Sequence, residues 1–262
     1  MDARAALSVQ ALAKTFPGGI QAVRDVSFTA GPGELVALVG ESGCGKTTTL
    51  KCVNRLLEPS SGRIEIDGED VAGLDPVALR RRIGWVMQGD GLFPHYSVFD
   101  NIAVVPRLLG WEPGRIAARV EELLKLVRLD PGEFARRKPA ALSGGQRQRV
   151  GVARALAAGP GLMLMDEPFG ALDPLTRDAL REDVAALQAG LGFAAVMVTH
   201  DMAEALLLAT RIAVMHQGEV IQYDTPERLL AAPADARVTR MLESPLREAA
   251  RIDALRTGAG HD

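Results

Sequence analysis

The segment Gly40-Glu-Ser-Gly-Cys-Gly-Lys46-Thr47 limits the possible folds of this chain more than any other part of the sequence. It follows a nearly continuous apolar run at 34–39, which predicts a strand buried on both faces, and it opens a predicted helix at 46–57. A glycine-rich turn between a strand and a helix directs successive backbone N–H groups inward, next to the positive end of the helix dipole. The pattern therefore predicts a phosphate-binding loop in an α/β fold.

The two polar residues that close this loop suit a nucleoside triphosphate. Lys46 can reach the β- and γ-phosphates, and the hydroxyl of Thr47 can coordinate magnesium. A glycine-rich turn with an exposed lysine is the alternative, and the flanking strand and helix argue against it. The loop alone does not distinguish adenine from guanine.

A second apolar run, at 162–165, ends in the acidic pair Asp166 and Glu167. Ligands of open α/β sheets collect at the carboxyl ends of the strands, so Asp166 is placed to hold magnesium directly or through water. Glu167 could polarise the attacking water. The alternative is that the two acids are simply solvated at a strand end, and the phosphate loop in the same chain argues against it.

The segment Leu142-Ser-Gly-Gly-Gln-Arg-Gln-Arg149 predicts a helix start at Ser143, followed by two glycines that expose backbone N–H groups. It therefore resembles a second phosphate-binding helix end. One nucleotide needs only one such cradle, so this end would serve the nucleotide of another chain, in a dimer. A capped, arginine-rich, solvated helix is the alternative.

The rest of the chain alternates between predicted strands and helices. Strands are expected at 6–11, 22–29, 63–71, 83–88 and 194–199, with a hairpin at 211–223; helices are expected from Pro76, at 145–158, at 175–191 and from Pro226, with the last residues frayed. Between 89 and 142 the apolar stripe Ile116, Val120, Leu123 and Val127 predicts a helical insert. We expect this stripe to pack within its own subdomain instead of binding a partner.

Composition excludes several classes of protein. With a net charge of −3 and basic residues interspersed among acidic ones, the sequence shows no basic cluster of the kind that binds nucleic acid. Two cysteines support neither a disulfide framework nor a zinc site. No membrane-spanning run and no export signal are visible, so we expect the chain to stay in the cytoplasm.

The motifs together resemble the ATP-binding cassette family from about Leu7 to Glu243. Gly40 to Thr47 matches the family's Walker A motif, Gln88 its glutamine loop, Leu142 to Gln146 its signature, Asp166 and Glu167 its Walker B motif and general base, Ala171 to Asp173 its D-loop, and His200 its switch histidine. All of them occur in the family's order. Taken alone, His200 and Gln88 would be ordinary polar residues at strand ends.

The resemblance implies a P-loop NTPase with a RecA-like mixed sheet core, an N-terminal antiparallel β subdomain and an α-helical subdomain inserted at about 89–158. The cassette would span 1–243, with a tail at 244–262. Catalysis would involve Glu167, His200, Gln88 and Lys46, and Mg²⁺ would be held by Thr47, Gln88 and Asp166. ATP would contact Phe16, Val23, Gly40, Glu41, Ser42, Gly43, Cys44, Gly45, Lys46, Thr47, Thr48, Gln88, Ser143, Gly144, Gly145, Gln146, Asp173 and His200.

Within these contacts Phe16 would stack on adenine, where the family more often has tyrosine. Gln88 would couple the magnesium and the attacking water to movement of the helical insert. The stretch Gly91 to Tyr96 would lie against a membrane-embedded permease, although Leu92, Phe93 and Tyr96 could equally be core residues.

The resemblance also implies partners: a second ATPase chain, permease subunits and an extracytoplasmic solute-binding protein, with the ATPase peripheral on the inner face of the membrane. Phe93-Pro-His95, 101–111 and Gln222-Tyr-Asp-Thr-Pro226 are similar to importers of glycine betaine, carnitine and choline. Importers of polar amino acids or sulfonates are the alternative. A cassette ATPase acting on DNA or ribosomes is disfavoured, because such chains usually carry coiled coils or two cassettes.

Overall fold

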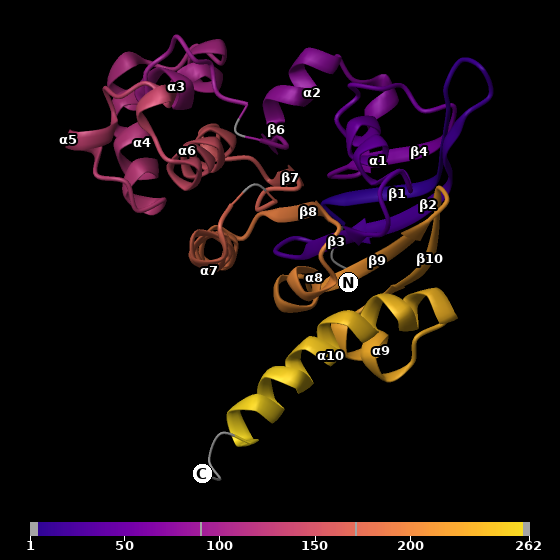
Figure 1. Ribbon diagram of the computed structural model, residues 1–262. Coiled ribbons are helices and arrows are strands. Elements are labelled where there is room, and N and C mark those ends of the chain that lie inside the picture. Colours follow the sequence, from indigo (N-terminus) through magenta and orange to yellow (C-terminus); the bar gives the residue numbers. More distant parts are fainter. Residues whose placement is uncertain (1–4, 90, 171, 259–262) are drawn as a thin grey trace.

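A computed structural model describes residues 5–89, 91–170 and 172–258. Within these residues one ten-stranded sheet has the order β5-β4-β1-β2-β10-β9-β3-β8-β7-β6 (Figure 1). The strands are β1 Leu7–Thr15, β2 Gln21–Ala30, β3 Leu35–Val39, β4 Ser61–Ile66, β5 Glu69–Asp70, β6 Ile83–Val86, β7 Leu162–Asp166, β8 Ala194–Thr199, β9 Arg211–His216 and β10 Glu219–Asp224.

The half of the sheet from β9 to β6 is parallel, and its middle strands β3, β7 and β8 are buried along their whole length. Strand β3 shows why these strands are apolar up to their carboxyl ends, where β7 ends in Asp166 and β8 in Thr199. Leu35, Ala37 and Val39 belong to one core cluster, whereas Val36 and Leu38 belong to the cluster on the opposite face of the sheet. Because successive side chains of a strand point to opposite faces, a strand covered on both sides is apolar throughout.

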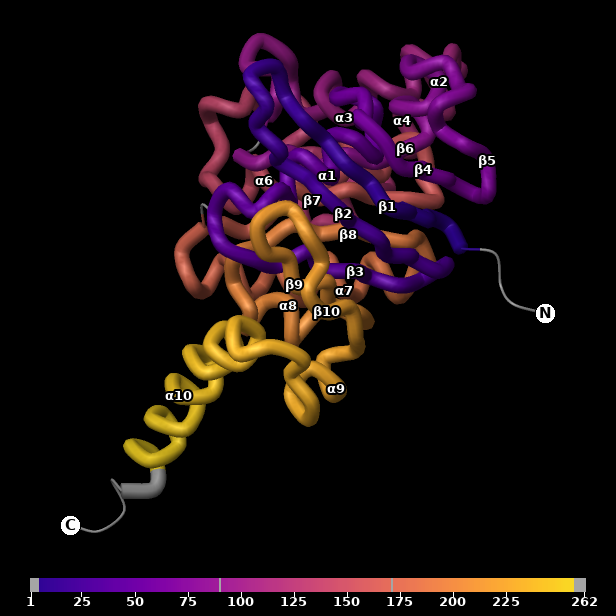
Figure 2. The backbone as a smooth tube through the Cα atoms, turned by 90° about the vertical axis from the view of Figure 1, so that its right-hand side faces the viewer, coloured from indigo at the N-terminus to yellow at the C-terminus, as the bar shows by residue number. Residues whose placement is uncertain are grey.

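The N-terminal half of the sheet is antiparallel and consists of β1, β2, β4 and β5. It joins the rest of the sheet where β2 meets β10, through a single parallel residue pair, Asp25 and Glu219. Figure 2 shows these strands crossing in front of the parallel core. The expected architecture, a mixed sheet with an N-terminal antiparallel part, is confirmed.

The helices are α1 Lys46–Val53, α2 Pro76–Arg82, α3 Val98–Leu108, α4 Pro113–Leu126, α5 Pro131–Phe134, α6 Gly144–Leu156, α7 Pro174–Leu191, α8 Met202–Leu208, α9 Pro226–Ala231 and α10 Ala236–Gly258, with 3₁₀ turns at Val71–Gly73 and Pro139–Ala141. Helices α3 to α6 gather beyond β6 as a separate helical layer (Figure 1). The predicted stripe of Ile116, Val120, Leu123 and Val127 is buried, and α4 packs against α3, α5 and α6, so its packing within the subdomain is confirmed. Among the described helices, none combines the length and the apolar character that a membrane crossing requires.

Two elements differ from the sequence expectations. Helix α1 ends at Val53 and not at residue 57, because Asn54 closes it and Arg55 adopts a left-handed φ of 48°. The expected strand at 63–71 is a hairpin of β4 and β5, since Asp67 and Gly68 both have positive φ and reverse the chain.

The C-terminal part is helical, as expected from Pro226 onward. Helix α10 runs from Ala236 to Gly258, so the expected boundary at 243 falls inside a continuous helix that contains Pro245. Its first half is anchored by the buried side chains of Val238 and Leu242, and its second half extends away from the sheet (Figure 1). Of the expected frayed end, residues 259–262 lie outside the described residues.

Candidate nucleotide-binding site

Four neighbouring parallel strands deliver the predicted site residues to one edge of the sheet. Strand β3 leads into the loop at Gly40, β6 into Gln88, β7 into Glu167 and β8 into His200. Parallel strands end on the same side, so side chains far apart in sequence meet there.

The phosphate loop is closely packed against the chain around it. A Cβ atom added to Gly40 would lie 2.3 Å from the carbonyl oxygen of Met215, and one added to Gly45 would lie 2.4 Å from that of Ala22. Gly45 also needs its φ of 104° to start α1. Only glycine fits these two positions, because neighbouring backbone leaves no room for a Cβ atom and because Gly45 has a positive φ.

Lys46 is only 6% exposed, and its ammonium group lies inside the loop. It donates hydrogen bonds to the carbonyl oxygens of Gly40 at 2.6 Å and Glu41 at 3.0 Å. A buried ammonium requires such acceptors, because an unpaired charge away from water is costly. The positive charge is thereby held at the centre of the phosphate loop.

Thr47 and Asp166 are joined across the site. The Thr47 hydroxyl donates to Oδ1 of Asp166 at 2.9 Å. Burial raises the pKa of Asp166 above its ordinary value, and the hydrogen bond from Thr47 acts in the opposite direction. A hydroxyl and a carboxylate fit Mg²⁺, which takes few protein oxygens and completes its octahedron with water and phosphate. In the described parts of the chain no group of three or more His, Cys, Asp or Glu residues is placed to hold a metal ion.

Glu167 lies between the two other predicted catalytic side chains. Its Oε2 accepts a hydrogen bond from the Gln88 amide nitrogen at 3.0 Å, and its Oε1 lies 3.4 Å from Nδ1 of His200. The structure therefore brings Gln88, Glu167 and His200 together. The hydrogen bond of Gln88 goes to Glu167 and not to Asp166, so its expected contact with the metal stays a prediction.

The backbone of Glu167 is strained. Its φ is +46°, and the next residue is Pro168, which disfavours a helical conformation in the residue before it. The conformation is held by a hydrogen bond from the Glu167 amide to the carbonyl oxygen of Val198 at 3.0 Å. Strain of this kind is frequent at functional sites, where the surrounding structure maintains it.

Ser143 caps helix α6 as the sequence indicates. Its hydroxyl accepts from the Gln146 amide at 3.2 Å, and the Gln146 side chain accepts from the Ser143 amide at 2.9 Å. Among the described residues no hydrogen bond joins 143–146 to the phosphate loop of the same chain. This end of α6 is in the helical layer, so an interaction with nucleotide would involve another chain's loop.

Gly145 has a packing role that the sequence did not indicate. A Cβ atom on it would lie 2.3 Å from Cγ2 of Thr176, in the first turn of α7. Gly144, in contrast, is exposed. The first glycine is thus available at the surface, while the second lets α6 approach α7.

Three other predicted contacts have distinct surroundings. Phe16 is half-buried, with the Lys14 ammonium 5.5 Å from the centre of its ring. The side chain of Val23 is fully buried and lies beneath Gly45, so it supports the loop and offers no exposed surface to a nucleotide. Asp173 caps α7, and its hydrogen bonds with Thr176 lower its pKa. Ala171 of the expected D-loop lies outside the described residues.

Sequence reasoning missed Glu204, which is buried behind His200 at the start of α8. A signal was present, because Asp201 is followed three residues later by glutamate, the pattern of a capping box. The Glu204 amide does donate to the Asp201 side chain, at 3.1 Å.

Cys44 offers a direct chemical test of the loop. Its sulfur lies 3.7 Å from the Lys46 ammonium and has little free space, so we expect alkylation of Cys44 by iodoacetamide to abolish ATP binding. Bound ATP should protect it. Mass spectrometry would give the labelling rate, and titration with a fluorescent nucleotide would give the affinity.

Cys52 is an internal control for this labelling, because it is fully buried and burial raises its pKa to about 11. It should remain unlabelled. Equal labelling of Cys44 with and without saturating ATP, together with surviving activity, would show that the loop does not bind the nucleotide.

The fold and this site define the class of protein. A glycine-rich loop between a buried strand and a helix, with its lysine enclosed and its threonine bonded to a strand-end aspartate, is the arrangement of P-loop nucleoside-triphosphate-binding proteins. Comparison with known proteins narrows the class. The chain belongs to the ABC transporter family, whose profile matches residues 23–170.

Characterised relatives are about half identical to this chain. The choline transport ATP-binding protein OpuBA of Bacillus subtilis is 50% identical over 94% of this chain and 66% of its own length. The glycine betaine/carnitine/choline transport ATP-binding protein OpuCA of the same species is 51% identical over 90% of this chain and 62% of its own length. The chain thus spans slightly less than two thirds of these relatives.

A solved structure of the same kind confirms the fold. The ATP-binding cassette MJ0796, determined as a dimer in a post-hydrolysis state with ADP and phosphate, matches with a TM-score of 0.75 and 33% sequence identity. The match covers 84% of this chain and 98% of the other.

Proposed function

We propose that this chain is the ATP-hydrolysing subunit of a membrane importer for a small solute. The first candidate for the solute is a quaternary amine such as glycine betaine, carnitine or choline. The observation that carries the proposal is the position of Glu167. Its carboxylate lies between Gln88 and His200, beside the Thr47–Asp166 pair. This geometry suits activation of a water molecule next to a bound triphosphate.

In this proposal each residue has one task. Lys46 and the loop N–H groups bind the phosphates, and Thr47 with Asp166 holds Mg²⁺, which when bound neutralises charge on the phosphate oxygens. Glu167 accepts the proton of the attacking water, and His200 contacts the γ-phosphate. Positioning and electrostatics account for most catalysis of phosphoryl transfer, so few groups are sufficient.

A homodimer would complete the site. The exposed helix end at Ser143 and Gly144 would bind the ATP held by the partner's loop, so that two chains enclose two ATP molecules. The dimeric state of MJ0796 supports this arrangement. Nucleotide binding would close the dimer and hydrolysis would open it, since the two states differ in affinity for the nucleotide.

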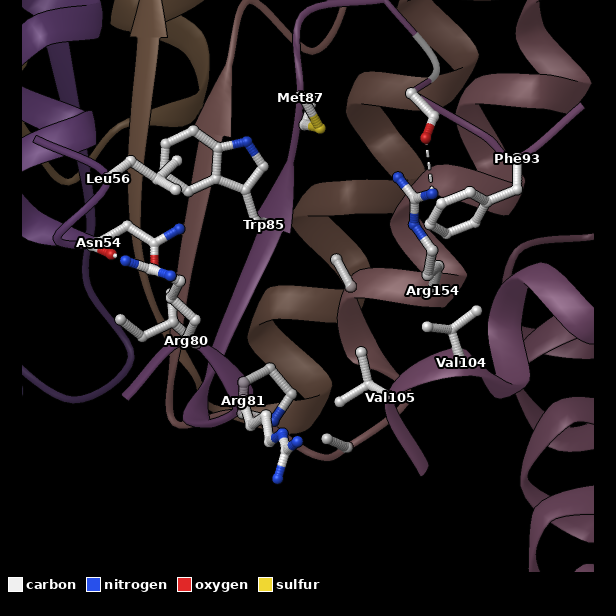
Figure 3. A pocket seen from close by; sticks show the side chains of 15 residues that line it. Asn54, Leu56, Arg80, Arg81, Trp85, Met87, Phe93, Val104, Val105 and Arg154 are labelled. Atoms are coloured by element: carbon white, nitrogen blue, oxygen red, sulfur yellow. Dashed lines mark hydrogen bonds between the residues drawn. The ribbon is translucent and has the colours of Figure 1, made fainter. Parts of the chain in front are cut away.

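A groove beside the site suits a permease. It has a volume of about 470 Å³ and lies between the sheet core and the helical layer (Figure 3). Apolar side chains, among them Trp85, Met87 and Phe93, line it together with the guanidinium-bearing Arg80, Arg81 and Arg154. Leu92 is buried, whereas Phe93 and Tyr96 are partly exposed, so the stretch at 91–96 supplies both core and surface. We propose that a short helix of the permease binds here.

The groove is connected to the Glu167 carboxylate through two consecutive residues of the chain. Met87 lines the groove, and the next residue, Gln88, donates to Glu167. On the opposite wall Arg154 of α6, the helix that Ser143 caps, donates to the Gly91 carbonyl oxygen at 2.8 Å (Figure 3). Movement of the bound permease helix would therefore reach both Gln88 and the signature end of α6, which couples transport to hydrolysis.

The choice of solute rests on the names of the relatives, since a solute that crosses the permease does not touch this subunit. Their identity of about 50% supports a quaternary amine, and an importer of polar amino acids or sulfonates is the second candidate. Such a complex would place this chain at the inner face of the membrane, with a solute-binding protein on the other side.

Reconstitution tests the proposal. The chain, a candidate permease and a matching solute-binding protein would be assembled in proteoliposomes containing ATP and Mg²⁺. We expect saturable uptake of radiolabelled glycine betaine or choline, and none of histidine or taurine. Uptake of an amino acid or a sulfonate alone would support the second candidate, whereas ATP hydrolysis without any transport would contradict the proposed role.

One variant separates the groove from the nucleotide site in this assay. Val105→Asp places a charge among the apolar groove residues, far along the chain from the phosphate loop. It should abolish uptake and permease binding while the isolated chain still binds ATP. Val77→Asp, an equally apolar but half-exposed position on α2, is the matched control.

A further inference from the structure

Glu204 is a buried carboxylate that the proposed hydrolysis does not use. It is only 4% exposed, and it lies in the first turn of α8, shortly after His200. The Thr199 hydroxyl accepts a hydrogen bond from the Asp201 amide at 3.0 Å, and the Asp201 side chain accepts one from the Glu204 amide at 3.1 Å. The residues on both sides of His200 are therefore bonded to each other and, through Asp201, to the backbone of Glu204.

Arg177, in the first turn of α7, is the second side chain that the proposed hydrolysis does not use. One of its terminal nitrogens donates to the Leu172 carbonyl oxygen at 3.0 Å, next to Asp173 of the expected D-loop. Its Nε is buried and has no hydrogen-bond partner among the described residues. An unpaired buried donor is costly, so a buried N–H normally finds an acceptor in the protein or in ordered water.

A small cavity joins these two side chains. It is lined by Arg177, Glu204, Glu167, Gly170 and the turn 199–201, and its volume is about 30 Å³. A polar cavity of this size is large enough for a water molecule, which needs roughly 10–15 Å³ of accessible space. Such a water could accept from Nε of Arg177 and donate to a carboxylate.

The charges around the cavity favour this link. Burial raises the pKa of Glu204 above its ordinary value, as does the nearby carboxylate of Asp201, while the guanidinium groups of Arg181 and Arg177 act in the opposite direction. Arg181 is itself ion-paired with Asp178. Among the described residues that line the cavity, Arg177 supplies the guanidinium group, and Glu167 and Glu204 supply carboxylates.

We propose that Arg177 and Glu204 form a positioning pair, linked through a water molecule in this cavity, that couples Leu172 and Asp173 to Glu167 and His200 of the same chain. The proposal rests on the proposed ATPase function. If the D-loop of each chain meets the other chain in the dimer, the pair would transmit dimer closure to the catalytic carboxylate and histidine. Neither residue would touch the nucleotide.

Steady-state ATP hydrolysis by the purified full chain tests the pair. We expect Arg177→Gln and Glu204→Gln each to lower kcat by roughly 10- to 100-fold, the loss expected when reacting groups are slightly misplaced. The KM for ATP and the thermal midpoint should stay close to the wild-type values. The kcat of the double variant should be no lower than that of the less active single variant, because both substitutions break the same link.

A conservative variant separates the hydrogen bond from the charge. Arg177→Lys keeps the positive charge but has no N–H group at the Nε position, so it should be impaired like Arg177→Gln. Arg228→Gln and Glu182→Gln, the same changes at exposed positions, are the matched controls and should hydrolyse ATP like the wild type.

The contrary results are equally specific. Single variants within about threefold of wild-type kcat, full activity of Arg177→Lys, or additive losses in the double variant would overturn the pair. A loss that appears only in KM or in thermal stability would also overturn it. Absence of hydrolysis in the wild type would contradict the proposed function itself, which distinguishes the two failures.

Discussion

Glu167→Gln is expected to slow ATP hydrolysis by roughly 10²- to 10⁴-fold, the usual contribution of a positioned general base. The amide keeps the shape of the side chain, and the strained backbone at this position is unaffected by the change of one atom. Because phosphate binding depends on the loop at 40–47, ATP binding should persist. The chain should therefore accumulate as an ATP-bound dimer, which size-exclusion chromatography with ATP and Mg²⁺ would detect.

The exposed Glu121, which pairs with Lys125 on the surface of α4, provides the control for this change. Glu121→Gln should hydrolyse ATP at the wild-type rate and should not accumulate as a dimer. Turnover of Glu167→Gln within a factor of about three of the wild type would exclude Glu167 as the general base.

Ser143→Arg is expected to abolish both ATP hydrolysis and ATP-dependent dimerisation. The large side chain would block the exposed end of α6, which we propose to face the partner's ATP. ATP binding by the separate chain should remain, since among the described residues no hydrogen bond joins 143–146 to the phosphate loop of the same chain. Nucleotide titration and light scattering measure the two properties independently.

Two companion variants make this result interpretable. Ser143→Ala removes only the capping hydroxyl, so it should cost about 1 kcal/mol of helix stability and retain dimerisation. Mixing Ser143→Arg with Lys46→Ala places both defects in one composite site and leaves the other site intact, so hydrolysis should partly return. A Ser143→Arg homodimer that closes and hydrolyses ATP like the wild type would contradict the shared site.

Local patterns predicted much of this molecule. The strand, loop and helix around Lys46, the capped helix at Ser143 and the acidic strand end at Asp166 all occur where the sequence indicates. Each depends on residues near one another in the chain, whose chemistry and spacing are visible in the sequence. The errors also have local causes. Residues 63–71 form a hairpin because Asp67 and Gly68 favour a turn over a continuous strand.

The sequence by itself determined the class of site and the residues that bind phosphate, because a glycine-rich loop with a lysine has few other chemical uses. Only the tertiary structure decided which distant side chains meet. The packing of Gly145 against Thr176, the burial of Val23 beneath the loop, and the cavity between Arg177 and Glu204 depend on how strands and helices are arranged. These contacts join residues that are far apart in the sequence. Strand order and side-chain packing bring such residues together, and local propensity does not.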